Sequence, residues 1–324
     1  MKKTFLTFAI TMTAGIISFA GNAKAQTITN TFGTGSNQFT LTFQTIGHTN
    51  NAADNITTPG TTNKYGAVNY QYDISTYSIS QNQINLAKSN GLLGVTGGAW
   101  SNNQPAANVT WLQAAAFVNF LDTNSGFHAA YNLTYSGGAY AQALWTNGQL
   151  GYNSSNPFRN SLAVYVLPTE NEWFKAAYYN PSANGGSGGY NLYSTGNTAP
   201  TKVASGTNAN TAVYGTNKPA SVSLAGGTSA YGTVGQSGNI NDFLESAFSG
   251  TNTNVSANRV YRGGGYSDVT NNLAATFRQQ AATNYSGGSV GFDVVELAVP
   301  EPSIYALFGL SALVLVIAYR RKVS

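Results

Sequence analysis

The chain of 324 residues contains no cysteine, and this absence limits how it can be held together. A fold without cysteine has no disulfides and no thiolate-bound metal. Its stability must come from a packed core and, where an ion contributes, from oxygen ligands. Tyrosine and phenylalanine are abundant, with 20 and 16 residues, while only 8% of all residues are charged. This composition is typical of an ordered, β-rich body with many tight turns and argues against intrinsic disorder.

The first 25 residues are typical of a secretory signal peptide. Lys2 and Lys3 precede an apolar run, and Ala23-Lys-Ala25 forms a small-x-small cleavage pattern. The apolar run is short for a bilayer span, which favours cleavage before Gln26 over the alternative of an uncleaved membrane anchor. We therefore interpret residues 1–25 as a signal peptide and the protein as exported.

The last segment, residues 299–324, has three parts. They are the tripeptide Pro300-Glu301-Pro302, an apolar stretch of sixteen residues from 304 to 319, and the basic pair Arg320 and Arg321. The apolar stretch is long enough to enter a membrane, and the basic pair after it would stay on the cytoplasmic side. This order resembles the PEP-CTERM sorting signal of Gram-negative bacteria. The resemblance implies an exosortase-type protease that recognises the tripeptide and removes the tail, and a plain single-span anchor is the alternative.

The net charge of +4 comes from these two ends. Six of the fifteen Lys and Arg residues lie there, so nine remain in the body against ten acidic residues. The mature body is therefore close to neutral, and the sequence pI of 9.1 is no sign of nucleic-acid binding. We expect no nucleic-acid partner.

Capping residues and apolar spacing predict three helices, which are capped by Ser80, Thr110 and Thr169 and cover residues 81–90, 111–121 and 170–179. Alternating polarity predicts strands over 39–43 and 67–79. Residues 122–162 and 180–230 are rich in glycine and small polar residues and are predicted as long loops. Loops of this length are unusual in a compact domain unless something orders them. From the residues alone, the fold class is α+β or β-rich, with few helices, short strands and long loops.

Five motifs follow one another along the body. They read Val109-Thr-Trp-Leu-Gln-Ala-Ala-Ala-Phe117, Leu167-Pro-Thr-Glu-Asn-Glu-Trp-Phe-Lys-Ala-Ala-Tyr178, Gly238-Asn-Ile-Asn-Asp-Phe243, Arg259-Val-Tyr-Arg-Gly-Gly-Gly-Tyr266 and Gly291-Phe-Asp-Val-Val295. In this order they resemble the formylglycine-generating-enzyme, or sulfatase-modifying factor, family. The resemblance implies an α+β, elaborated C-type-lectin-like fold over residues 65–298, preceded by a strand and loop segment over 26–64.

The resemblance also implies a calcium site. In the family, the segment that matches 238–243 binds calcium through oxygen atoms, which would make Asn239, Ile240 and Asp242 the ligands here. The alternative is an Asn/Asp turn that satisfies its own backbone. Glu170 and Glu172 lie in the first turn of a predicted helix, where carboxylates cap backbone N–H groups, and we interpret them as structural.

The metals of the family's oxidases lack their ligands in this chain. One branch holds copper with two cysteines just after the Arg-Gly-Gly motif, and Asp268 and Leu273 stand near those positions here. A second branch holds non-haem iron with histidines on an added helical domain, whereas this chain has only His48 and His128. We therefore expect neither copper nor iron and assign no catalytic residue. An enzyme of unrecognised type that uses the same pocket is the alternative.

The family's pocket is walled by the last third of the chain. In that third, the candidates for ligand contacts are Tyr266, Phe277, Arg278, Asn284 and Tyr285. Aromatic and amide side chains suit a polysaccharide or a peptide. The sequence thus favours an exported, non-catalytic binding or extracellular-matrix protein. We expect it to be anchored in the membrane transiently and to reach the cell envelope, the cell surface or the matrix.

Overall fold

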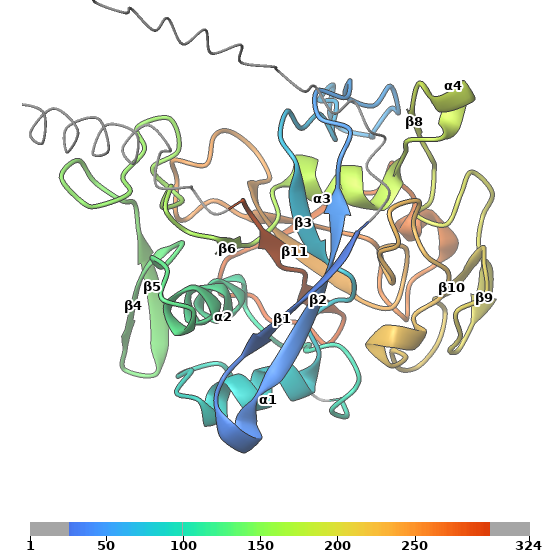
Figure 1. Cartoon of the computed structure of the whole chain (residues 1–324). Coiled ribbons are helices and arrows are strands. Elements are labelled where there is room, and N and C mark those ends of the chain that lie inside the picture. The colour runs from blue at the N-terminus through green and yellow to red at the C-terminus, as the bar shows by residue number, and fades with distance from the viewer. Residues whose placement is uncertain (1–25, 99, 299–324) are drawn as a thin grey trace, which may run out of the picture.

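The computed structural model describes residues 26–98 and 100–298 (Figure 1). The predicted signal peptide, residues 1–25, and the predicted sorting signal with its apolar stretch, residues 299–324, lie outside the described residues. Within the described part of the chain, no helix is both long and apolar enough to cross a membrane.

An antiparallel sheet of five strands joins the two ends of the body (Figure 1). Its strands, in spatial order, are β1 (Thr27–Phe32), β2 (Phe39–Ile46), β3 (Tyr72–Ser75), β15 (Val295–Glu296) and β6 (Tyr165–Val166). The last strand of the described residues therefore lies between a strand from the first quarter of the chain and a strand from its middle. The predicted strand over 39–43 is confirmed as part of β2, whose residues Phe39, Leu41 and Phe43 are buried.

A second sheet of four strands carries three of the five motifs. Its order is β13 (Gln279–Ala281), β12 (Arg259–Arg262), β11 (Asn241–Ala247) and β14 (Val290–Phe292). The pairing of β11 with β14 is parallel, whereas β12 is antiparallel to both of its neighbours. This sheet brings the segments 238–243, 259–266 and 291–295 side by side.

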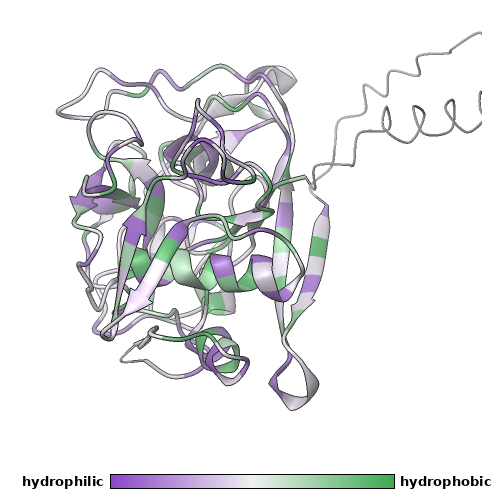
Figure 2. Cartoon of the chain, turned by 90° about the vertical axis from the view of Figure 1, so that its left-hand side faces the viewer, coloured by the Kyte–Doolittle hydropathy of each residue, from purple (hydrophilic) through white to green (hydrophobic). Residues whose placement is uncertain are grey.

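The three predicted helices are confirmed as α1 (Gln81–Ser89), α2 (Trp111–Asn124) and α3 (Glu170–Tyr178). Each begins with a complete capping box, made by Ser80 and Gln83, Thr110 and Gln113, and Thr169 and Glu172. Figure 2 shows apolar and polar residues alternating along the strands and sharing the surface of the helices. The apolar residues form one large core that spans both sheets.

The predicted strand over 67–79 is wrong in its extent, because only β3 (Tyr72–Ser75) pairs as a strand. The residues before it bond to an irregular loop instead. The carbonyl of Val68 accepts a hydrogen bond from the Asn50 N–H at 3.0 Å, and the Val68 N–H donates to the Asn51 Oδ1 at 3.3 Å. Hydrogen bonds to loop residues therefore replace the strand pairing that the alternating polarity predicts.

The long segments predicted as loops contain short ordered elements. Between α2 and α3 lies a hairpin of β4 (Asn132–Ser136) and β5 (Ala139–Ala143). Gly137 and Gly138 join its strands with φ values of 59° and 85°, as a two-residue hairpin turn requires. After α3 come β7 (Tyr179–Asn180), α4 (Ala183–Gly186), β8 (Gly189–Tyr190), β9 (Thr201–Val203), β10 (Thr211–Val213) and the 3-10 turn η2 (Val222–Leu224). Two further 3-10 turns are η1 (Gly35–Asn37) and η3 (Thr270–Leu273).

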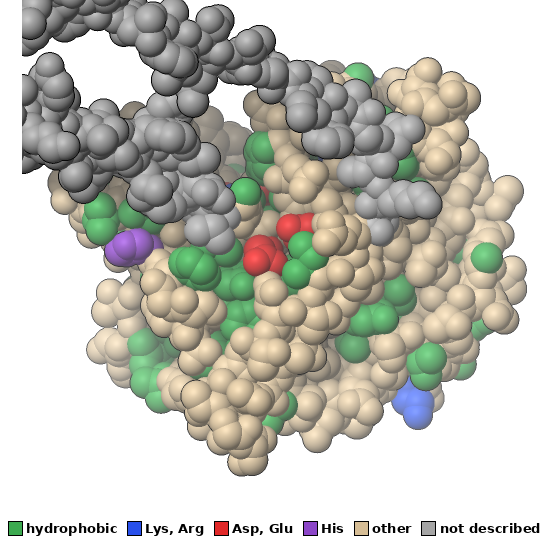
Figure 3. Space-filling view, in the orientation of Figure 1, with side chains coloured by type: hydrophobic (Ala, Val, Ile, Leu, Met, Phe, Trp, Pro, Cys, Tyr) green, Lys and Arg blue, Asp and Glu red, His purple; other side chains and the backbone are tan. Residues whose placement is uncertain are grey.

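The low charge of the sequence is visible on the surface. Figure 3 shows one side of the molecule on which charged side chains are few. Several of the body's charged residues are instead buried, among them Glu170, Glu172, Glu245, Arg259 and Arg262. The ion pairs and hydrogen bonds of these buried charges show which roles the sequence motifs have in the fold.

Candidate functional site

The first group of buried charges is an ion-paired triad of Glu170, Arg262 and Arg278. Glu170 Oε1 lies 2.7 Å from Arg262 Nε and 2.8 Å from Arg278 Nε, and Glu170 Oε2 lies 2.9 Å from Arg278 Nη2. Arg262 also donates to the carbonyls of Ala275 and Phe277 at 3.0 and 2.8 Å. These contacts tie the start of α3 to the end of β12 and to the segment before β13.

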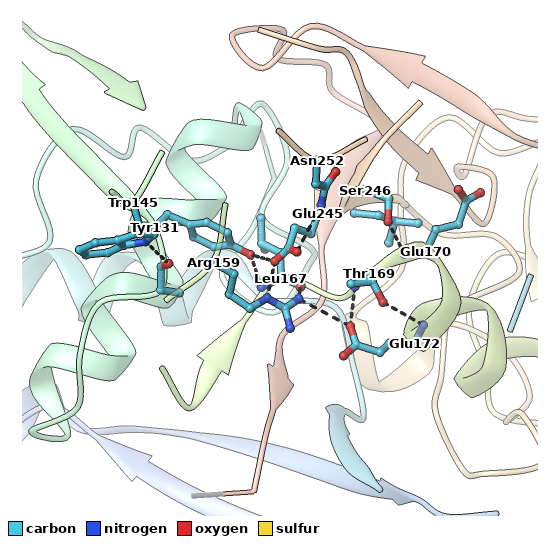
Figure 4. Close-up of polar contacts among 12 residues, drawn as sticks. Tyr131, Trp145, Arg159, Leu167, Thr169, Glu170, Glu172, Glu245, Ser246 and Asn252 are labelled. Atoms are coloured by element: carbon cyan, nitrogen blue, oxygen red, sulfur yellow. Dashed lines mark hydrogen bonds and ion pairs between the residues drawn. The ribbon is translucent and has the colours of Figure 1, made fainter. Parts of the chain in front are cut away.

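A second network centres on Glu245 of β11 (Figure 4). Its Oε2 lies 2.6 Å from Arg159 Nε and accepts a hydrogen bond of 2.6 Å from the Tyr131 hydroxyl. Arg159 Nη2 also donates to the Leu167 carbonyl at 3.1 Å and lies 3.8 Å from Glu172 Oε2. Sequence reasoning missed Arg159 and Glu245. The only signal in the sequence was the scarcity of charged residues in the body, since each isolated charge in such a body needs a partner.

Both glutamates of the α3 motif have structural partners, but only Glu172 caps a backbone N–H as predicted, whereas the Glu170 carboxylate binds Arg262 and Arg278. Glu172 Oε2 accepts the Thr169 N–H at 2.6 Å and its Oε1 accepts the Tyr70 hydroxyl at 2.5 Å. The Glu170 N–H donates to the Ser246 hydroxyl at 2.9 Å. Both carboxylates are thus held by partners within the fold.

Asp242 and Asp293 form a buried carboxylate pair. The indole Nε1 of Trp173 donates to Oδ2 of both residues, at 3.2 Å and 3.1 Å. The hydroxyls of Ser78 and Ser75 donate to the opposite oxygens at 3.3 Å and 3.2 Å. Burial raises the pKa of Asp293 to about 7, and burial together with the neighbouring Asp293 raises the pKa of Asp242 well above its usual value. The pair therefore retains a proton near neutral pH.

The residues predicted to bind calcium have oxygen atoms of a suitable type, but these atoms already accept hydrogen bonds. Asn239 has a left-handed φ of 66°, and its Oδ1 accepts the Ala220 N–H at 2.7 Å. Its carbonyl accepts the Tyr266 N–H at 2.9 Å, and Asp242 belongs to the carboxylate pair. Ile240 is fully buried. An ion here would have to replace several of these protein donors, so calcium stays a prediction.

Thermal melts test this prediction. A ligand that binds only the folded state stabilises it by about 2.7 kcal/mol at a hundredfold excess over its Kd, so calcium should raise the Tm and a chelator should lower it. Asn239→Gly removes one ligand oxygen but tolerates the left-handed backbone, and it should abolish the calcium increment. Asn147→Ala, at an exposed turn, should keep it. Equal Tm values for the unmodified protein in calcium and in chelator would contradict calcium binding.

The loop after the Arg-Gly-Gly motif is closed by Asp268. Its Oδ2 accepts the Gly265 N–H at 2.7 Å, and its Oδ1 accepts the Asn272 Nδ2 at 3.1 Å. Leu273 is fully buried in a small second core cluster with Tyr193. The two residues nearest the positions of the oxidase thiolates are thus held within the protein, one by hydrogen bonds and one by packing.

The five predicted pocket residues differ in their surroundings among the described residues, and their shared role stays a prediction. Tyr266 packs edge-on against Trp100, with ring centroids 5.3 Å apart, and Tyr285 is 48% exposed. Phe277 is half-buried, and the Arg278 guanidinium is bound by Glu170. Asn284 lines a shallow cleft of about 360 Å³ that none of the other four residues lines.

The two histidines have different surroundings. His128 is exposed, while His48 packs near Tyr179, with ring centroids 6.2 Å apart. Among the described residues, no three His, Asp or Glu side chains are grouped to hold a metal.

Comparisons with known proteins agree with this fold. The model of the sulfatase-modifying factor enzyme 1-like domain matches residues 37–298, and that of the PEP-CTERM protein-sorting motif matches residues 298–322. A comparison with curated proteins found no match.

Two solved structures are similar across most of the chain. "Treponema denticola variable protein 1" is 20% identical with a TM-score of 0.57, over 83% of this chain and 99% of that one. The "Crystal Structure of CarF" is 15% identical with a TM-score of 0.52, over 85% of this chain and 98% of that one. At these identities the likeness concerns the fold alone, and it confirms the predicted α+β, formylglycine-generating-enzyme-like architecture.

Proposed function

The chain belongs to the sulfatase-modifying factor enzyme 1-like family, and we propose that it is an exported binding protein on that scaffold rather than an oxidase. The PEP-CTERM motif implies export, sorting to the cell envelope and processing by an exosortase-type system. The binding function of the folded body is our proposal.

The observation that carries the proposal is the use of Asp268 and Leu273 in closing and packing their loop. Copper(I) sites are built from soft sulfur donors. The sequence offers none in the body, because it has no cysteine and its two methionines are Met1 and Met12, within the predicted signal peptide. The carboxylates of the α3 motif are held in ion pairs and capping contacts. What the body presents outward is mainly uncharged and polar, with a few exposed rings such as those of Tyr70, Tyr135 and Tyr285, which supports contact with an extracellular polysaccharide or peptide.

We expect the purified protein not to convert cysteine to formylglycine in a sulfatase-type peptide, with or without added copper. The physical reason is that no rearrangement of oxygen and nitrogen ligands supplies a thiolate. Mass spectrometry of the peptide would show the aldehyde as a clear decrease in mass. An active formylglycine-generating enzyme serves as the positive control. Aldehyde above the level of a boiled sample would overturn the proposal and direct attention to a metal site that includes His48 or His128.

A further inference from the structure

A cleft of about 420 Å³ lies where the β1–β2 turn, the start of α1 and the η2 turn meet. Its lining residues share one property, since none of the eleven carries a charge: Gln38, Phe39, Thr40, Ser80, Asn82, Gln83, Leu86, Asn103, Ser221, Val222 and Ser223. Four segments that are far apart in the sequence contribute to it. In Figure 1, α1 and the turn between β1 and β2 lie next to each other at one end of the body.

The polar lining side chains fall into two groups. Ser80 and Gln83 are used by the capping box of α1, and Gln83 Nε2 also donates to the Thr40 carbonyl at 2.8 Å. The other polar side chains of the lining make no hydrogen bond to another described residue, and they are Gln38, Thr40, Asn82, Asn103, Ser221 and Ser223. The cleft therefore presents three amides and three hydroxyls whose hydrogen-bonding capacity is available to a ligand.

These groups select a ligand by their chemistry. An amide or a hydroxyl both donates and accepts hydrogen bonds, as does every hydroxyl of a sugar. A lining without charge offers no ion pair to a carboxylate, a phosphate or an ammonium group, so a charged ligand would give up its hydration for neutral hydrogen bonds alone. Leu86 and Val222 add apolar surface that suits the C–H faces of a sugar ring.

A peptide fits this cleft less well. Extended peptides commonly bind by adding a strand to an open sheet edge. The one strand that contributes to the lining is β2, which is paired with β1 along the cleft and with β3 only over residues 43–46. At the cleft, the Thr40 carbonyl on the second edge already accepts a hydrogen bond from Gln83 Nε2. The cleft offers side chains rather than a free row of backbone groups.

A row of threonines continues outward from Thr40. Thr40 pairs across the strands with Thr31, and Thr42 pairs with Thr29, whose hydroxyls are 3.5 Å apart. Thr27 extends the row along β1. Side chains on one face of a strand repeat about every 6.8 Å, so the row offers evenly spaced hydroxyls to a chain-like ligand.

We infer that this cleft binds a neutral, hydroxyl-rich glycan chain, which continues along the threonine row. The inference rests on the proposed binding function and names its site and its class of ligand. It places the site away from Tyr266 and Tyr285, because neither residue lines the cleft.

The test is calorimetric titration of the full chain, purified in its exported form, with cellohexaose, maltohexaose, mannohexaose and a hexagalacturonate. We expect at least one neutral hexasaccharide to bind and the anionic one not to bind. Asn82→Ala combined with Asn103→Ala should weaken binding about tenfold, as expected when two neutral hydrogen bonds are lost. Ser223→Trp, a filling change at an exposed position, should abolish binding. Asn147→Ala, an amide removed outside the cleft, should leave it unchanged, and equal Tm values establish that the variants fold.

The outcomes separate this inference from the proposed function. Neutral glycan binding that is equal in all variants would overturn the cleft assignment and leave the binding function standing. Failure of every neutral glycan to bind the unmodified protein, or tighter binding of the anionic one, would overturn the inference. Aldehyde formation in the peptide assay would overturn the proposed function independently of either result.

Discussion

Glu170→Ala is expected to destabilise the body by about 3–5 kcal/mol, because removing one partner of a buried ion pair leaves the other charge uncompensated. Here the loss is shared by two guanidinium groups, those of Arg262 and Arg278, whose side chains are 0% and 7% exposed. Urea denaturation followed by far-UV circular dichroism measures the change. The variant should unfold at much lower urea or fail to accumulate.

Two control variants make this result interpretable. Glu170→Gln keeps the shape and part of the hydrogen bonding and should lose less than the alanine variant. Lys88→Ala removes a charge from an exposed position and should change stability by less than about 0.5 kcal/mol. A loss below about 1 kcal/mol for Glu170→Ala would contradict the triad, since it would mean that both arginines find other partners or water.

The stability of the body should fall as the pH rises from 5 to 8. Burial raises the pKa of Asp293 to about 7 and that of Asp122 also to about 7, from 3.8 when unfolded. Between those values the folded state holds protons that the unfolded state has released, so increasing pH favours unfolding. One unit of pKa shift corresponds to about 1.4 kcal/mol, and the expected loss is on the order of 2–4 kcal/mol.

Thermal melts at several pH values measure this loss, and Asp242→Asn isolates the contribution of the carboxylate pair. The amide can still accept the Trp173 N–H but cannot ionise, so the proton that Asp242 holds in the folded state is removed from the balance and the fall with pH should become shallower. The comparison ends at pH 8 because burial lowers the pKa of Lys175 to about 8, which acts in the opposite sense above that value. A Tm that rises steadily from pH 5 to 8 would contradict the raised pKa values.

The helices could be predicted because their signals are local. Ser80, Thr110 and Thr169 each cap a helix whose capping partner is only three residues away, and all three boxes are complete. The family resemblance supplied the fold around them. The β4–β5 hairpin was missed because its strands read as polar and small residues, and only the Gly137-Gly138 turn marked it.

The candidate site was less predictable, because whether a side chain faces solvent or is buried in an ion pair depends on residues far away in the sequence. Arg278 stands among aromatic and amide residues and reads as a pocket residue, yet its ion pair with Glu170 joins residues 108 positions apart. Arg159 and Glu245 are likewise 86 positions apart. The uncharged cleft could not be predicted. Asn82, Asn103 and Ser221 are ordinary surface residue types, and only the fold brings their segments together.

Export imposes an order on folding through β15. An exported chain emerges from its N-terminal side, so β1, β2 and β3 are available early, while Val295 and Glu296 come only just ahead of the Pro-Glu-Pro tripeptide. Until then, β3 keeps an open edge, and open strand edges are templates for aggregation. Pairings between distant segments are also slow to form. We therefore expect the sheet to be completed only when almost the whole body has crossed the membrane. If the apolar tail anchors the chain, as its sequence predicts, each molecule would have time to close its last strand in isolation before it is released among its neighbours.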